Sequence, residues 1–255
     1  MPSRNIELSA FDDFLSLRVL LFSIISLVLT FLLFMAIFSF LYSSYSGEYD
    51  IDFFKSVENI THDIFVFMEA YPLFSFIIEH KIIMLLLHYL IYFGVGLLFY
   101  YLFVAFYSFI ISFFIIYFIS YLQKKYYTDV KLEGIGIVST TFFYLKSILI
   151  TIILFVIFSP AYIIPALNLL IFVPIYYFFH KTLVYDVSSV INTKREYKKI
   201  KKVNGAELKA RTGFCFLLTL IPVFGILLYP YYFLYIGHYL LRETRELRYV
   251  EAFNA

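Results

Sequence analysis

The stretch Val19–Leu41, VLLFSIISLVLTFLLFMAIFSFL, is 23 residues long and contains no charged side chain. As an α-helix it would cover roughly 34 Å, which is enough for the roughly 30 Å hydrocarbon core of a bilayer. The whole chain agrees with this, because 62% of its residues are hydrophobic, 15% are charged and its mean hydropathy is +0.87. A soluble core of this length cannot hide so much apolar surface. We therefore predict an integral membrane protein in which Val19–Leu41 spans the bilayer.

Charged residues are distributed unevenly along the chain. Residues 42–81 contain 2 basic and 7 acidic residues, whereas the rest of the chain contains 18 basic and 11 acidic residues. The first stretch therefore has a net charge of −5 and the rest +7, within an overall charge of +2. Because Lys and Arg concentrate on the cytoplasmic side of membrane proteins, we expect residues 42–81 on the outer face and both termini in the cytoplasm.

Residues 82–122 form the longest apolar stretch, with 41 residues and no Lys, Arg, Asp or Glu. As one helix it would extend roughly 60 Å, about twice the hydrocarbon thickness. A turn near Gly94 would allow two crossings, but it would place the basic residues after Leu122 outside, against the charge distribution. We therefore favour one long crossing.

Two later segments, 134–179 and 214–241, are apolar but interrupted, and each has basic residues on both sides. The second arm of the first segment has about 14 residues, whereas a helix that crosses the whole bilayer needs about 20. If 214–241 crossed once, it would export the arginines that follow it. Both segments are therefore predicted as hairpins that enter the membrane partway and return.

The fold class that follows is an all-α integral membrane protein with two long transmembrane helices and two partially inserted, re-entrant helical hairpins. We expect one membrane domain, 1–255. Its predicted order is an interfacial helix at 6–18, a span at 19–41, an outer-face segment at 42–81, a long span at 82–122, a hairpin at 134–179, a basic cytoplasmic linker at 180–213, a hairpin at 214–241 and a cytoplasmic tail at 242–255.

Several kinds of function lack their sequence signatures. Acidic residues precede the first apolar run and no small-residue cleavage site follows it, so we expect no cleavable signal peptide. The only cysteine, Cys215, excludes an intrachain disulfide and a cysteine-based metal site. There is no glycine-rich phosphate loop, no Gly-x-Ser-x-Gly elbow and no pair of acids inside the apolar arms. We therefore expect neither an enzyme nor a bound cofactor or metal, and any transport would be passive or driven by a gradient.

Three blocks of sequence carry a resemblance to a known family: FDDFLSLR at Phe11–Arg18, LVYD at Leu183–Asp186 and LIPVFGILLYP at Leu220–Pro230. In their order and spacing they resemble the CysZ sulfate permeases and their relatives, the etoposide-induced membrane protein family. The resemblance implies a homo-oligomer of the fold described above, which passes sulfate into the cytoplasm across the bacterial inner membrane. The chain departs from the family pattern at Ser16, where the motif has Gly, and at Val19, where a second Arg often follows.

Arg18 is the principal candidate for binding the anion, together with Ser16 and Leu17. It is a cation at the cytoplasmic start of a span, beside free backbone N–H groups and the positive end of a helix dipole. Ser16 adds a hydroxyl donor, and a bound sulfate requires several hydrogen-bond donors. The alternative is an ordinary interfacial arginine that reaches the headgroups or pairs with Asp12 or Asp13.

Other polar residues within the apolar arms are weaker candidates. Pro222 and Gly225, at the apex of the second hairpin, could line or support a pore. Lys146 and Asn168, in the first hairpin, could face a solute, although a snorkelling lysine and an amide that caps broken backbone are the simpler interpretations. His238 is expected to be a structural histidine with its hydrogen bonds satisfied.

A basic cluster follows the first hairpin, and its cationic residues are Lys194, Arg195, Lys198, Lys199, Lys201 and Lys202. Such a cluster on the cytoplasmic side attracts anionic lipid or an anion leaving a pore, and it is also typical of a plain solvated loop. Nucleic-acid binding is not expected, because no basic domain with interleaved aromatic residues accompanies the cluster. The sequence thus leaves two functions open: a permease or channel for sulfate or a related oxyanion, and a membrane scaffold or bilayer-shaping protein that binds anionic lipid.

Overall fold

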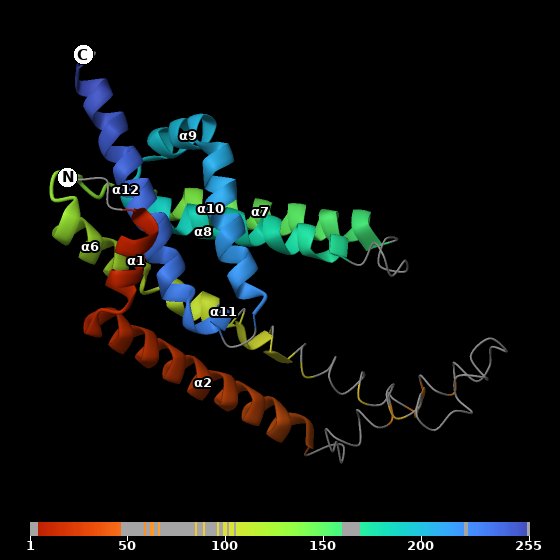
Figure 1. Cartoon of the computed structure of the whole chain (residues 1–255). Coiled ribbons are helices and arrows are strands. Elements are labelled where there is room, and N and C mark those ends of the chain that lie inside the picture. The colour runs from red at the N-terminus through yellow and green to blue at the C-terminus, as the bar shows by residue number, and fades with distance from the viewer. Residues whose placement is uncertain are drawn as a thin grey trace. The chain divides into compact units, whose positions relative to one another are not determined.

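The computed structural model is all-helical in its regular secondary structure, with no strand in the part of the chain that it describes (Figure 1). The described residues are 5–46, 59, 62–63, 66, 85, 89, 96, 99–100, 102–104, 106–159, 169–221 and 224–253. Most of the predicted outer-face segment 42–81 lies outside them. Contacts divide the chain into two compact units, one made of Met1–Ser26 with Phe109–Ala255 and the other of Leu27–Ser108.

The named helices account for most of the described chain (Figure 1). They are α1 (Ile6–Phe14), α2 (Leu17–Ser46), α6 (Ile115–Tyr126), α7 (Ile137–Phe158), α8 (Phe172–Ile191), α9 (Lys194–Val203), α10 (Gly205–Thr219), α11 (Phe224–Leu227) and α12 (Tyr229–Phe253).

Two of these helices are long and apolar enough to cross a membrane. Within α2, Leu17–Phe40 has 24 residues and a mean hydropathy of 2.8, which agrees with the predicted first span. The second candidate is α7, with 22 residues and a mean hydropathy of 2.3. It forms the first arm of the predicted hairpin 134–179 and is long enough to span the bilayer by itself.

The predicted long span 82–122 is described only in part, and that part is not one uninterrupted helix. A helix at Leu102–Ser112 meets α6 at a bend, and the two count as a third candidate span only if they are taken together. At the bend, Phe113 N–H donates to the carbonyl of Ile110 at 3.2 Å, and Ser112 Oγ donates to the carbonyl of Phe109 at 2.7 Å. A serine that bonds back to the preceding turn competes with the helical ladder, which is a recognised cause of bending.

Both predicted hairpins contain helices that continue beyond the apolar runs that predicted them. Helices α7 and α8 pack against each other, and α8 continues beyond Phe179 to Ile191. Helix α10 begins at Gly205, before the apolar run at 214. Polar residues on an exposed face cost a helix little, so hydropathy alone underestimates its length.

Helix α12 forms the core of the unit that contains the two chain ends. Every residue from Pro230 to Leu241 is buried, and the helix packs against α1, α6 and α8 (Figure 1). Pro230 is tolerated because it is the second residue of α12, where its missing N–H would have no helical acceptor. A helix that is apolar and aromatic all round is typical of a position inside a bundle.

Helix α9 is fixed at its start by a capping box. Thr193 Oγ1 accepts a hydrogen bond from the Glu196 N–H at 3.3 Å, and Glu196 Oε2 accepts one from the Thr193 N–H at 2.8 Å. The same carboxylate accepts from Arg248 Nε of α12 at 2.7 Å. The predicted basic cluster is therefore a helix with a defined position on the unit.

Candidate functional site

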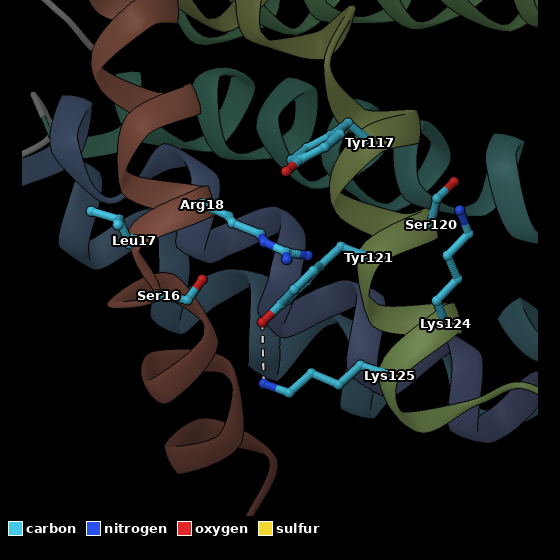
Figure 2. Close-up of a pocket in the computed structure, with 8 residues that line it drawn as sticks. All are labelled: Ser16, Leu17, Arg18, Tyr117, Ser120, Tyr121, Lys124 and Lys125. Carbon is cyan, nitrogen blue, oxygen red and sulfur yellow. Dashed lines mark hydrogen bonds between the residues drawn. The ribbon is translucent and has the colours of Figure 1, made fainter.

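A pocket of about 700 Å³ lies between the turn from α1 to α2 and helix α6 (Figure 2). Its lining comes from two distant parts of the sequence: Ser16, Leu17 and Arg18 from the turn, and Tyr117, Ser120, Tyr121, Lys124 and Lys125 from α6. All three residues predicted to bind the anion thus line one cavity. Helix α6 adds further hydroxyl groups and two ammonium groups to the lining.

The turn between α1 and α2 places Arg18 in the first helical turn of α2. Ser16 N–H donates to the carbonyl of Asp13 at 3.1 Å, and the Ser16 carbonyl accepts from Leu20 N–H at 3.0 Å. The amides of Leu17 and Arg18 therefore precede the first hydrogen bond of the α2 ladder. Unpaired amides and the positive end of the helix dipole favour an anion at this position.

The polar groups of this turn are available to a ligand. Ser16 Oγ is buried and has no hydrogen-bond partner among the described residues. The Arg18 side chain is exposed and forms no ion pair within the described part of the chain. The alternative pairing of Arg18 with Asp13 is not formed, because the Asp13 oxygens contact Lys125 and His238 instead. A hydroxyl and a guanidinium without partners are the donors that an oxyanion needs.

The three cationic side chains of the pocket are not equivalent. Lys125 is held by Asp13, and its Nζ also donates to the Tyr121 hydroxyl at 3.1 Å (Figure 2). Lys124 forms no ion pair with a described residue, and it leaves α6 on the side away from Arg18, as does Ser120 (Figure 2). The pocket therefore has one neutralised cation and two that lack an acidic partner in the described structure.

Asp13 connects this pocket to the core. Its side chain is fully buried, and it accepts hydrogen bonds from Lys125 Nζ at 2.6 Å, Tyr126 at 3.1 Å and Tyr121 at 3.3 Å. His238 Nε2 of α12 lies 2.9 Å from its other oxygen. Burial raises the pKa of Asp13, but the hydrogen bonds from His238 and Lys125 outweigh it and hold this pKa below its usual value.

Sequence reasoning did not find this network. His238 was expected to be structurally satisfied, and it is, with Nδ1 lying 3.3 Å from the Tyr127 hydroxyl. A local signal for Asp13 did exist, because it falls at helical spacing with Ala10 and beside Phe14, on the buried face of α1. An acid on the apolar face of a short helix requires a partner inside the protein.

The remaining candidates that the structure describes do not line the Arg18 pocket. Lys146 lines a second cavity, of about 780 Å³, together with Lys194, Lys198, Lys201 and Lys202 of α9. Arg195 and Lys199 do not line it, and Lys199 pairs with Glu251. Asn168 and Pro222 lie outside the described residues.

Gly225 lies close to the backbone of Thr219 in the turn before α12. A Cβ atom at this position would lie 2.8 Å from the Thr219 carbonyl oxygen and 2.9 Å from its Cα. Such contacts are too short for any side chain, so the close approach of the backbone requires glycine here. Gly225 lines neither of the two cavities.

The described residues contain no group of three or more His, Cys, Asp or Glu side chains placed to hold a metal ion. The site is therefore built from cations and hydroxyls. The fold and the site together define an all-α integral membrane protein with a basic, hydroxyl-lined pocket at the start of a candidate span.

A family model described as Sulfate transporter CysZ/Etoposide-induced protein 2.4 matches residues 8–230, and the chain belongs to this family. The match begins in α1, includes the turn that carries Arg18 and ends at Pro230, the last residue of the second hairpin motif. The predicted resemblance is thereby confirmed. At the level of the family, the function is that of a sulfate transporter, which is not an enzymatic one. No curated protein and no solved structure matches the chain.

Proposed function

We propose that the protein passes sulfate or a related oxyanion across the bacterial inner membrane and binds it in the Arg18 pocket. The observation that carries the proposal is a pair of donors without a partner among the described residues, the Arg18 guanidinium and the buried Ser16 hydroxyl. They lie in a cavity of about 700 Å³ at the start of α2. Charge-assisted hydrogen bonds are the strongest that a protein offers an oxyanion.

The pocket also accounts for the two departures from the family motif. Val19 stands where a second arginine often follows, and it is fully buried, so a cation there would have no access to water. Helix α6 contributes Lys124 and Lys125 to the lining of the same cavity, but Lys125 is paired with Asp13 and Lys124 leaves α6 on the side away from Arg18 (Figure 2). Ser16, which replaces glycine, contributes a hydroxyl that glycine lacks. The chain thus provides an anion site with a different set of donors.

The membrane arrangement belongs to the same proposal. Both termini lie in the cytoplasm, because the basic residues concentrate in the segments that flank the hairpins. The hairpins α7–α8 and α10–α12 enter the bilayer from that side. The homo-oligomer that the family resemblance implies is part of the same proposal. Transport is passive or driven by a gradient.

The test is uptake of labelled sulfate by liposomes that contain the purified protein, combined with equilibrium binding in detergent. Loss of one charge-assisted hydrogen bond costs about 1.5–3 kcal/mol, so Arg18→Ala should weaken sulfate binding by about 10- to 100-fold. Arg18→Lys keeps the charge and should retain part of the affinity. The matched control is Lys209→Ala, an exposed cation of α10 outside both cavities.

Two results would count against the proposal. Uptake no faster than in empty vesicles would refute transport, and equal binding by the Arg18→Ala variant and the control would refute this site. If vesicles were deformed without any uptake, the second candidate, a bilayer-shaping scaffold, would be favoured. The observation behind that candidate is the basic surface of α9 beside the apolar helix α7.

A further inference from the structure

The second cavity, which we call the α7–α9 cavity, lies between α7, α8 and α9 and has a volume of about 780 Å³. Six lysines line it: Lys146, Lys181, Lys194, Lys198, Lys201 and Lys202. No acidic residue is among its described lining residues, and it shares no residue with the Arg18 pocket. Lys146 and the α9 lysines are far apart in the sequence and carry no sign there of a common site, whereas the fold brings them to one cavity.

The charges of this cavity are not compensated within the described structure. None of the six lysines forms an ion pair with a described residue; Lys194 Nζ reaches only Ser139 Oγ, at 3.4 Å. Lys181 and Lys201 each lie over a tyrosine ring, at 5.4 Å and 5.7 Å from the ring centres. Burial, and then the positive charge of Lys201, lowers the pKa of Lys181 to about 8. Crowded ammonium groups without a counter-charge are stabilised by an anion bound between them.

A surface suited to lipid adjoins the cavity. Phe142, Leu145 and Leu149 of α7 are 74%, 61% and 59% exposed. Together with Lys146 they recur at the spacing of one helix face, because residues three and four apart are neighbours on a helix. Lys146 therefore lies within an apolar stripe of a candidate membrane span, and Phe142 belongs both to the stripe and to the cavity lining.

We propose that the α7–α9 cavity binds the phosphate headgroup of an anionic phospholipid whose acyl chains lie along the α7 stripe. A free oxyanion would use the lysines but not the apolar stripe, so the combination favours lipid. Six cations around one cavity favour a headgroup with two phosphate groups over one with a single phosphodiester. Basic pockets beside transmembrane helices on the cytoplasmic side are suited to such headgroups.

The experiment measures thermal unfolding of the full-length protein in detergent with a dye that reacts with thiols. Cys215 is the only cysteine and is fully buried, so labelling reports unfolding. The added probes are cardiolipin, phosphatidylglycerol, phosphatidylcholine and inorganic phosphate. Cardiolipin should raise the unfolding temperature in a saturable manner, phosphatidylglycerol less so, and phosphatidylcholine not at all.

The test variant is Lys146→Ala combined with Lys181→Ala, which removes one cation from α7 and one from α8. Each lysine near a phosphate headgroup contributes about fivefold, so the loss of two should lower the apparent cardiolipin affinity by about 30-fold. The corresponding arginine double variant should retain most of the affinity and shows that the site still folds. The control is Lys131→Ala with Lys209→Ala, two exposed cations that do not line the cavity.

Three outcomes would overturn the proposal: equal cardiolipin affinity in the alanine and control variants, equal stabilisation by phosphatidylcholine, or inorganic phosphate binding as tightly as cardiolipin. The last result would assign the cavity to a free anion. Sulfate binding at Arg18 should be unchanged in the Lys146/Lys181 variant, so failure of the lipid proposal and failure of the transport proposal are separate results.

Discussion

Replacement of Asp13 should be the most damaging single change at the candidate site. The Asp13 carboxylate is fully buried and has four hydrogen-bonded neighbours, of which Lys125 and His238 are ionisable. Breaking a buried pair by removal of one partner costs about 3–5 kcal/mol. The Lys125 side chain is 45% exposed and can turn to water, but that of His238 is only 4% exposed and cannot. We therefore expect Asp13→Ala to lower the free energy of unfolding by about 3 kcal/mol.

The assay is equilibrium unfolding in detergent, with sulfate binding measured on the same samples. Asp12→Ala is the matched control, because Asp12 is the adjacent acid and is exposed; its loss should cost less than about 1 kcal/mol. Combining Asp13→Ala with His238→Ala should give an effect smaller than the sum of the single effects, since the two side chains are in direct contact. Equal destabilisation by the Asp12 and Asp13 variants, or strict additivity with His238→Ala, would refute the reasoning.

The same network has a pH dependence of known sign. The folded protein holds the pKa of Asp13 below its ordinary value of 3.8. Its stabilising contribution is therefore complete above that value and is lost as the pH falls through the folded pKa. The stability difference between the unaltered protein and Asp13→Asn should accordingly be largest near neutral pH and shrink below about pH 4.

Two further predictions concern packing and buried charge. Gly225→Ala should destabilise the protein by about 1–3 kcal/mol in thermal unfolding, because the added Cβ would lie 2.8 Å from the Thr219 carbonyl oxygen. Gly205→Ala is the control and should not destabilise it, because a Cβ there would have no atom within 4 Å. If both alanine variants melt alike, the close approach is not required. Burial raises the pKa of Asp186 to about 7, so ionisation destabilises the folded state increasingly from about pH 4 to 7. At pH 8, Asp186→Asn should raise the unfolding temperature, and the corresponding gain in the free energy of unfolding should be at most about 4 kcal/mol. At pH 4 the substitution should not stabilise the protein. A stabilisation that is independent of pH would contradict this explanation.

The resemblance of the chain to its family was readable from short blocks because each block carries a local requirement. The Pro-x-x-Gly apex at Pro222–Gly225 is one example: the glycine must approach the backbone of Thr219, and no other residue fits there. Arg18 is another, since its position in the first turn of α2 follows from the start of an uncharged run. Local requirements of this kind can be recognised without knowledge of the tertiary structure.

The bend between Ser112 and Ile115 was not predicted, because the stretch contains neither proline nor glycine. The serine that bonds back to Phe109 is a weak signal, since Ser23 and Ser26 also bond back to preceding carbonyls within the single helix α2. The lengths of α8 and α10 were also underestimated. Hydropathy finds the part of a helix that can meet lipid, but the helix continues where polar side chains face water.

By itself, the sequence determined that the chain is an all-α membrane protein, where its first span lies and which short turn presents Arg18. These features depend on composition and on residues that are neighbours in the chain. Only the tertiary structure decided what faces Arg18 and what accompanies Lys146. Asp13 and Lys125 are 112 residues apart and Asp13 and His238 are 225 apart, yet each pair is in contact. Such pairs form because the buried helix α12 gathers α1, α6 and α8 around it, and one sequence without its fold does not say which helices become neighbours.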